Sequence, residues 1–146
     1  MWNDSSGRQQ VIASQRLIFA GSPATIAAKP ATNLPKRKWV LVTGTAFGAS
    51  GHAVLIREEA CYRVSQGSGC YGARRAVWTV VRPSGFYAAY YPVRRFLADG
   101  TDCADPNILG LCELNAAVLD SNGIPDDSFG VSRIGAPAAL LSFRTR

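Results

Sequence analysis

The chain has 146 residues, of which 47% are apolar and 18% are charged, and its formal net charge at pH 7 is +6. This composition excludes a disordered chain and a charged coiled coil, and the length is that of a single domain, 1–146, with its own core. Residues 1–97 carry 13 Lys or Arg and 3 Asp or Glu, a net of +10, whereas residues 98–146 carry 3 and 7, a net of −4. A basic part beside an acidic part indicates a molecule with one face turned toward a polyanion.

The first 97 residues are predicted to form a flexible N-terminus followed by a hairpin and a sheet. Residues 1–10 are polar and contain no basic leader followed by an apolar stretch, so we expect no signal peptide and a cytoplasmic location. Within residues 11–97, two apolar runs flank Gly21-Ser-Pro23, a pattern typical of a β-hairpin. Further β-branched and aromatic runs predict strands near residues 39–43, 52–65, 74–82 and 86–91.

Two local signals refine this sheet. The stretch 66–72, QGSGCYG, is predicted to be a turn between two strands. Pro92 cannot donate a ladder hydrogen bond, so the strand that contains it is expected at a sheet edge or to be bulged near its end.

The acidic part predicts helices. Asp105-Pro106 has the residues of a helix N-terminus, and apolar residues then recur at helical spacing up to Asn122-Gly123, which is typical of a helix end. A second, shorter helix is expected within the helical region 105–135, followed by a C-terminal extension, 136–146. The sequence therefore predicts an α+β fold in which two C-terminal helices cover an antiparallel sheet, and a dimer would help to cover so long a sheet.

The four cysteines do not have the spacing of a zinc site, and His52 is the chain's one histidine. For a cytoplasmic chain we expect free thiols, although Cys70 and Cys103 lie in loop-like sequence and could pair with each other or with a neighbouring chain.

Catalytic and metal sites are not expected, and neither is a cofactor. His52 follows a Gly-rich stretch that faintly resembles the histidine region of a trypsin-like protease, but no nucleophile motif follows it. We therefore expect a hydrogen-bonded histidine at a strand end. The stretch 120–127 loosely resembles a calcium loop, but the terminal bidentate Glu is missing.

The basic strands suggest a nucleic-acid surface, because arginines bind phosphates and aromatic rings stack on unpaired bases. In residues 74–82, period-two alternation puts Arg75 and Thr79 on one face and Trp78 on the other. We expect Trp78 to pack beneath the helices, which leaves the Arg75 face for a ligand. The residues predicted to contact RNA are Tyr62, Arg63, Arg75, Val77, Thr79, Tyr87 and Tyr91.

Three segments resemble the coat proteins of small single-stranded RNA bacteriophages of the levivirus type. LIFAGSPATIAAKP (17–30) is similar to the first hairpin of that family, CYRVSQGSGCYGARRAVWTVVRP (61–83) to its central strands, and FLADGTDCADPNILGLCELNAAVLDSNGIPDD (96–127) to its last strand end and helices. Together they cover about half of the chain in the same order.

The resemblance implies a five-stranded antiparallel sheet, an interlocked dimer with a joint ten-stranded sheet, and assembly into an icosahedral shell around genomic RNA. It also implies repression of translation through an RNA hairpin, inter-subunit disulfides through Cys70 or Cys103, and a virion assembled in a bacterial cytoplasm. We expect single-stranded RNA and further copies of this chain as partners, but no membrane and no enzymatic activity. The alternatives are a non-viral basic β-rich RNA-binding domain and a degenerate protease-like domain.

Overall fold

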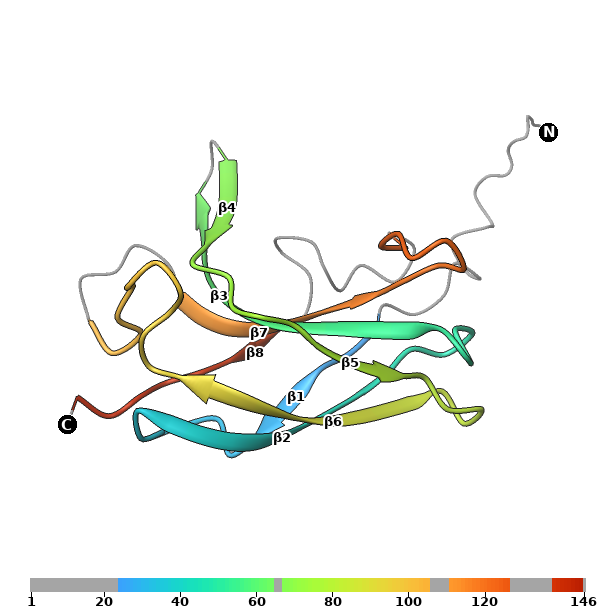
Figure 1. Ribbon diagram of the computed structural model, residues 1–146, viewed down its shortest axis with the longest axis horizontal. Helices are drawn as coiled ribbons and strands as arrows, with labels where there is room; N and C mark the ends of the chain where they lie inside the picture. Colours follow the sequence, from blue (N-terminus) through green and yellow to red (C-terminus); the bar gives the residue numbers. More distant parts are fainter. Residues whose placement is uncertain (1–23, 65–66, 106–110, 127–137, 146) are drawn as a thin grey trace.

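The computed structural model describes residues 24–64, 67–105, 111–126 and 138–145, and these residues form an all-β structure (Figure 1). The strands are β1 (Ala27–Lys29), β2 (Arg37–Thr45), β3 (Ala53–Val64), β4 (Gly67–Tyr71), β5 (Val77–Val80), β6 (Phe86–Arg94), β7 (Leu111–Val118) and β8 (Ala139–Leu140).

The strands form two sheets that face each other. The first sheet has the order β1-β2-β6, and the second has the order β4-β3-β7-β8, with β5 also paired to β3. All the strand pairs are antiparallel. β3 is the central strand of the second sheet: one edge pairs with β7, and the other edge pairs first with β5 and then with β4.

The hydrophobic core lies between the two sheets and follows from period-two alternation. In β2, Val40 and Val42 are buried while their neighbour Trp39 is exposed. In β3, Val54 and Ile56 are buried in the same core cluster. The other core residues from the paired strands are Tyr87, Tyr91 and Val93 of β6 and Leu114, Ala116 and Val118 of β7.

The predicted α+β fold is wrong, because no helix occurs in the described part of the chain. The segment expected to be the long helix contains β7, which pairs with β3 over eight residues. Cys112, Leu114, Ala116 and Val118 face the core at every second position, so the apolar residues also fit a strand. Pairing with β3 and burial in the core favour the strand periodicity of this segment over the helical periodicity. Most of the second predicted helix lies outside the described residues.

The predicted strands were more accurate. The runs near residues 39–43, 52–65 and 86–91 lie in β2, β3 and β6, and β6 is an edge strand, as Pro92 indicated. The stretch 66–72 is not only a turn, because it contains β4, which pairs with β3. The first strand of the predicted N-terminal hairpin lies outside the described residues, and β1 pairs with β2.

The basic part of the sequence, 1–97, and the acidic part, 98–146, do not form two separate layers. β7, from the acidic part, lies beside the basic-part strand β3 in the same sheet. Arg95 and Asp102 come from the two parts and form a bidentate ion pair with N···O distances of 2.6 and 2.8 Å. The expectation of a basic sheet under an acidic helical layer is therefore wrong.

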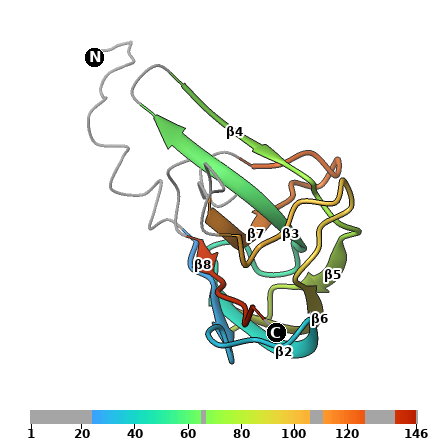
Figure 2. The ribbon, with the colours of Figure 1, turned by 90° about the vertical axis from the view of Figure 1, so that its left-hand side faces the viewer.

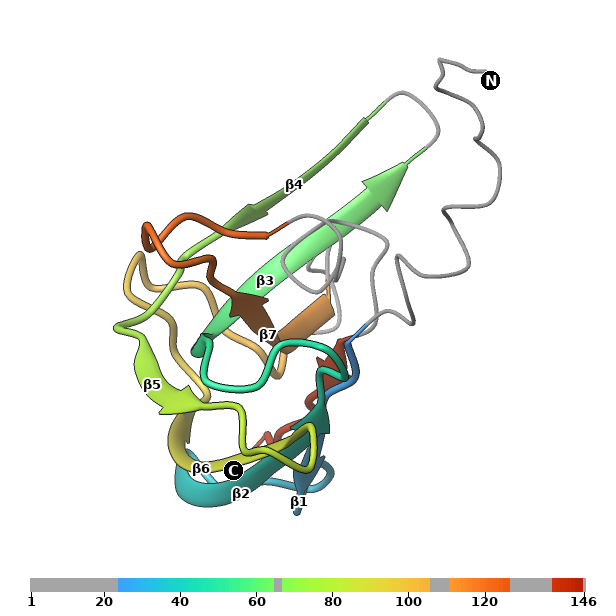
Figure 3. The same ribbon diagram turned by 90° about the vertical axis from the view of Figure 1, so that its right-hand side faces the viewer.

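All four cysteines form disulfides within the chain, Cys61 with Cys70 and Cys103 with Cys112. The expectations of free thiols, of a Cys70–Cys103 bond and of bonds between subunits are therefore wrong. Cys61–Cys70 crosses the β3–β4 ribbon, which projects beyond the other strands (Figures 2 and 3). Cys103–Cys112 fastens the loop after β6 to the start of β7. Within the described residues, no helix has the length and apolarity needed to cross a membrane.

Candidate ligand-binding cleft

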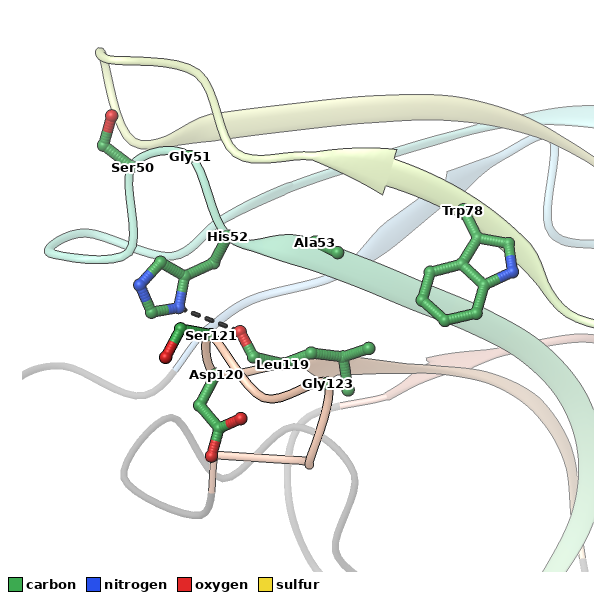
Figure 4. Close-up of a pocket in the computed structure, with 9 residues that line it drawn as sticks. All are labelled: Ser50, Gly51, His52, Ala53, Trp78, Leu119, Asp120, Ser121 and Gly123. Atoms are coloured by element: carbon green, nitrogen blue, oxygen red, sulfur yellow. Dashed lines mark hydrogen bonds between the residues drawn. The ribbon is translucent and has the colours of Figure 1, made fainter.

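A cleft of about 460 Å³ opens on the outer side of the second sheet, where β3 begins and β7 ends (Figure 4). Its volume lies in the range of about 300–1,000 Å³ that small-molecule sites occupy. The lining residues come from the loop before β3, from the first residue of β3, from β5 and from the turn after β7. They are Ser50, Gly51, His52, Ala53, Trp78, Leu119, Asp120, Ser121 and Gly123.

The imidazole of His52 is fixed by a hydrogen bond from its Nδ1 to the backbone carbonyl oxygen of Leu119, at 2.9 Å. A carbonyl oxygen only accepts, so Nδ1 carries a hydrogen, and in the neutral ring Nε2 is left with its lone pair. The backbone of His52 is also held, because its N–H donates to Ala49 and its carbonyl accepts from Val81. The expectation of a hydrogen-bonded histidine at a strand end is confirmed.

The turn after β7 forms the wall of the cleft beneath His52. One oxygen of the Asp120 carboxylate accepts the backbone N–H groups of Asn122 and Ile124 at 2.8 and 3.0 Å. Gly123 completes the turn with a φ of 78°, a left-handed conformation that favours glycine. This carboxylate therefore shapes the turn, whereas the sequence had suggested a helix end or a loose calcium loop.

Trp78 stands on the opposite side of the cleft from His52, with Ala53 between them (Figure 4). Trp78 is 59% exposed, and it lies beside Leu55 on the outer face of the sheet. The alternation predicted for residues 74–82 is correct, but the two faces are exchanged: Trp78 faces outward and Thr79 faces inward. Thr79 points toward β6, where its hydroxyl donates to the carbonyl of Ala88 at 2.9 Å.

The predicted RNA-contact residues do not form one surface. Tyr87 and Tyr91 are each only 1% exposed, and their hydroxyls donate to the backbone carbonyls of Thr25 and Arg75 at 2.6 and 3.1 Å. Burial raises the pKa of Tyr87 and raises the pKa of Tyr91 to about 12. Neither ring is available to stack on a base.

The other predicted contact residues are scattered. Arg75 is exposed beside β5, Val77 is half-buried against the core, and Tyr62 is half-buried on β3. The side chain of Arg63 lies outside the described residues. The cleft residues His52 and Trp78 were seen in the sequence but were not assigned to a ligand site. Two signals mark the cleft, the Gly-rich loop 44–51 before β3 and the Asn-Gly turn after β7.

One group of potential metal ligands occurs among the described residues, formed by Glu59, Cys61 and Cys70. Both sulfurs are already bonded to each other, so this group does not offer thiolates to a metal. The cleft itself has one imidazole and one carboxylate, and that carboxylate is engaged in its own turn.

Comparison with known proteins identifies a fold and no family. No known protein family matches the chain, and no curated protein matches it. The solved structure of macromomycin is similar, with a TM-score of 0.51 and 17% sequence identity, over 83% of this chain and 99% of that one. At this identity the likeness establishes the fold alone.

The resemblance to phage coat proteins is therefore wrong. It implied an N-terminal hairpin, a five-stranded sheet and two crossing helices, whereas the described residues form two facing sheets that resemble macromomycin. The sequence segments shared turn residues and strand lengths with the coat-protein pattern, which many antiparallel proteins also share. The predictions of a capsid protein, of shell assembly and of RNA packaging are therefore wrong as well, because they rested on that resemblance.

Proposed function

We propose that this protein binds a small planar aromatic molecule in the cleft between Trp78 and His52. The observation that carries the proposal is the pairing of a widely exposed indole with an imidazole whose orientation is fixed, on opposite sides of one cleft. An exposed aromatic side chain in a concave site is typical of ligand recognition.

The two side chains supply complementary interactions. The face of Trp78 can stack on an aromatic ring, which contributes about 0.5–1.5 kcal/mol beyond the area that it buries. In the neutral ring, Nε2 of His52 can accept a hydrogen bond from a hydroxyl or N–H of the ligand. Ala53 and Gly123 are small residues at the floor and wall, so a flat molecule can lie close to the backbone.

Binding without catalysis stays a prediction. The Nδ1 atom of His52 is hydrogen-bonded to a backbone carbonyl, whereas the catalytic histidine of a serine protease is oriented by a carboxylate. The protease-like alternative would require hydrolysis that is lost in His52→Ala.

The predicted partners also stay predictions, namely single-stranded RNA and a second copy of this chain. The two disulfides favour folding in an oxidising compartment over the cytoplasm that the sequence suggested.

The test uses 2-naphthol as the probe and 2-methoxynaphthalene as a matched compound that cannot donate a hydrogen bond. Binding is followed by the NMR signals of the Trp78 indole N–H and the backbone amides of the cleft. We expect 2-naphthol to bind more tightly than 2-methoxynaphthalene, and Trp78→Ala to weaken its binding about tenfold.

Trp39→Ala is the matched control, because Trp39 is similarly exposed, at 63%, but lies on the first sheet. His52→Ala should remove the preference for 2-naphthol over the methoxy compound. Equal weakening by Trp78→Ala and Trp39→Ala, or no shift of the cleft signals, would rule out the proposal.

A further inference from the structure

A second concave site lies between β6 and the segment that leads into β5. It shares no residue with the cleft and is lined by several basic residues. It is a recess of about 280 Å³. Its lining residues are Arg74, Arg75, Ala76, Val77, Tyr91, Pro92 and Arg94. Three arginines therefore line one small recess.

Among the residues that the structure describes, none of these three arginines forms a direct ion pair like that of the neighbouring Arg95 with Asp102. Arg95 forms a bidentate ion pair with Asp102 and donates to two C-terminal carbonyls. Within the described part of the chain, the guanidinium groups of Arg75 and Arg94 have no hydrogen bond or ion pair. Arg74 makes one long bond of 3.4 Å, to the carbonyl of Phe96. Like charges that line one recess repel one another, and the carboxylate of Glu58 offsets only part of that repulsion. A bound anion would relieve more of it.

A buried carboxylate lies behind this recess. Glu58 of β3 is fully buried, and one of its oxygens accepts the backbone N–H of Arg94 at 2.9 Å. The other oxygen, Oε2, is buried and has no hydrogen-bond partner among the described residues. The backbone of Glu58 is tied to the recess as well, because its N–H donates to the hydroxyl of Tyr91, which in turn donates to the carbonyl of Arg75.

We propose that the recess binds an oxyanion group, a phosphate ester, sulfate ester or carboxylate, through the guanidinium groups of Arg74, Arg75 and Arg94. Arginine forks match the geometry of such groups, and charge-assisted hydrogen bonds are the strong ones. The site is separate from the aromatic cleft and does not depend on the function proposed for that cleft.

Glu58 makes this site sensitive to pH. Burial raises the pKa of Glu58 to about 7, and the backbone hydrogen bond from Arg94 and the charges of Arg74 and Arg94 only partly oppose that rise. The charged groups that act on the Glu58 carboxyl are these two arginines. The hydroxyl of Tyr91 also lies nearby, and the pKa of Tyr91 is in turn influenced by Glu58, Arg74 and Arg57. Below pH 7 the carboxylate is protonated, so one negative charge behind the recess disappears and an anion binds more tightly.

The basic surface extends beyond the recess. A second recess of about 250 Å³ shares Pro92 and Arg94 with it and adds Arg37, Lys38 and Trp39. The positive charges of Arg37 and Lys38 add to the positive potential around Arg94. Because salt screens charges, the affinity of the recess for an anion should fall as ionic strength rises.

The first probe is inorganic sulfate, whose double negative charge does not change between pH 5.5 and 8, with sodium chloride at equal ionic strength as the reference. Binding is measured on the full chain from the backbone and arginine side-chain NMR signals of Arg75 and Arg94. We expect sulfate affinity to rise about fivefold between pH 8 and pH 5.5. In Glu58→Gln the affinity should not depend on pH.

The variants Arg75→Gln and Arg94→Gln should each weaken sulfate binding about tenfold. Both leave in place the backbone atoms that hold Tyr91 and Glu58, so the fold around the recess is retained. Arg82→Gln is the matched control, because Arg82 is exposed and lines none of the sites described above. Phenyl phosphate, phenyl sulfate and benzoate at pH 8 then distinguish the three sources of the anion.

Three results would overturn the inference. The first is that sulfate and chloride shift the NMR signals equally. The second is that Arg94→Gln and Arg82→Gln have the same sulfate affinity. The third is that the sulfate affinity of Glu58→Gln still depends on pH. A failure of 2-naphthol to bind in the cleft would leave this site unaffected, since no residue is shared between them.

Discussion

Replacement of the buried Glu58 by glutamine should make the protein more stable at neutral and alkaline pH. Glu58 is fully buried, and within the part of the chain that the structure describes its Oε2 has no hydrogen-bond partner. Ionisation therefore places a charge where water cannot solvate it. Glutamine has nearly the same shape and keeps a side-chain oxygen that can accept the N–H of Arg94.

The magnitude follows from the pKa of Glu58, which burial raises from 4.5 to about 7 in the folded protein. Below pH 4.5 the carboxyl is protonated in both the folded and the unfolded states. As pH rises from 4.5 to 7, the unfolded state ionises and the folded state does not, so the free energy of unfolding falls; above pH 7 the fall is complete. A shift of this size corresponds to about 3 kcal/mol.

Urea unfolding of the wild type and of Glu58→Gln, followed by tryptophan fluorescence with the disulfides intact, measures this difference. Buffers should contain chloride and no phosphate or sulfate, so that no oxyanion binds near Arg94. We expect Glu58→Gln to gain about 3 kcal/mol relative to the wild type between pH 4.5 and pH 8. Every other titrating group is common to the two proteins, so a difference that is independent of pH would refute the assignment to Glu58.

Three other substitutions test the packing between the sheets. Gly44→Ala should destabilise the protein by about 1–3 kcal/mol, because the added methyl group would meet the hydroxyl of Tyr87. Tyr91→Phe should cost about 1–3 kcal/mol in urea unfolding, because its hydroxyl joins the backbone of β3 at Glu58 to the segment before β5 at Arg75. Replacement of both Cys103 and Cys112 by alanine should lower stability by about 3 kcal/mol, since the lost disulfide closes a loop with a sequence separation of 9.

Each of these tests has a control on the same chain. Thr43→Ala and Tyr90→Phe change exposed neighbours on β2 and β6, and their unfolding free energies should stay within about 0.5 kcal/mol of the wild type. Thiol titration of the unfolded, unreduced wild type should find no free cysteine. A Tyr91→Phe variant as stable as Tyr90→Phe would mean that the buried hydroxyl bonds are not needed.

The strands of the first sheet could be predicted because their signals are local. Arg37–Thr45 and Phe86–Arg94 are rich in β-branched and aromatic residues, and Pro92 identified the edge. Their pairing could not be predicted in the same way, because β2 and β6 lie about a third of the chain apart and β6 does not pair with its sequence neighbour β5.

The second sheet was harder because β7 contains residues that suit both a helix and a strand. Ala116 and Ala117 are strong helix formers, and Asn122-Gly123 ends either element. The deciding contacts come from β3, more than 50 residues earlier, whose register pairs Ile56 with Ala116. A local pattern cannot contain that information, so propensity was overridden by the tertiary context.

The two candidate sites depend on the same short strand, β5, and on its alternation. Trp78 points outward into the cleft, whereas its neighbour Val77 lines the basic recess on the β6 side. β5 is held to β3 by its register and to β6 by the Thr79 hydroxyl, so its two faces stay distinct. A ligand in the cleft and an anion in the recess can therefore bind at the same time, separated by one strand. The sequence pattern predicted Trp78 on the inner face, and its outward position is what gives the cleft its aromatic side.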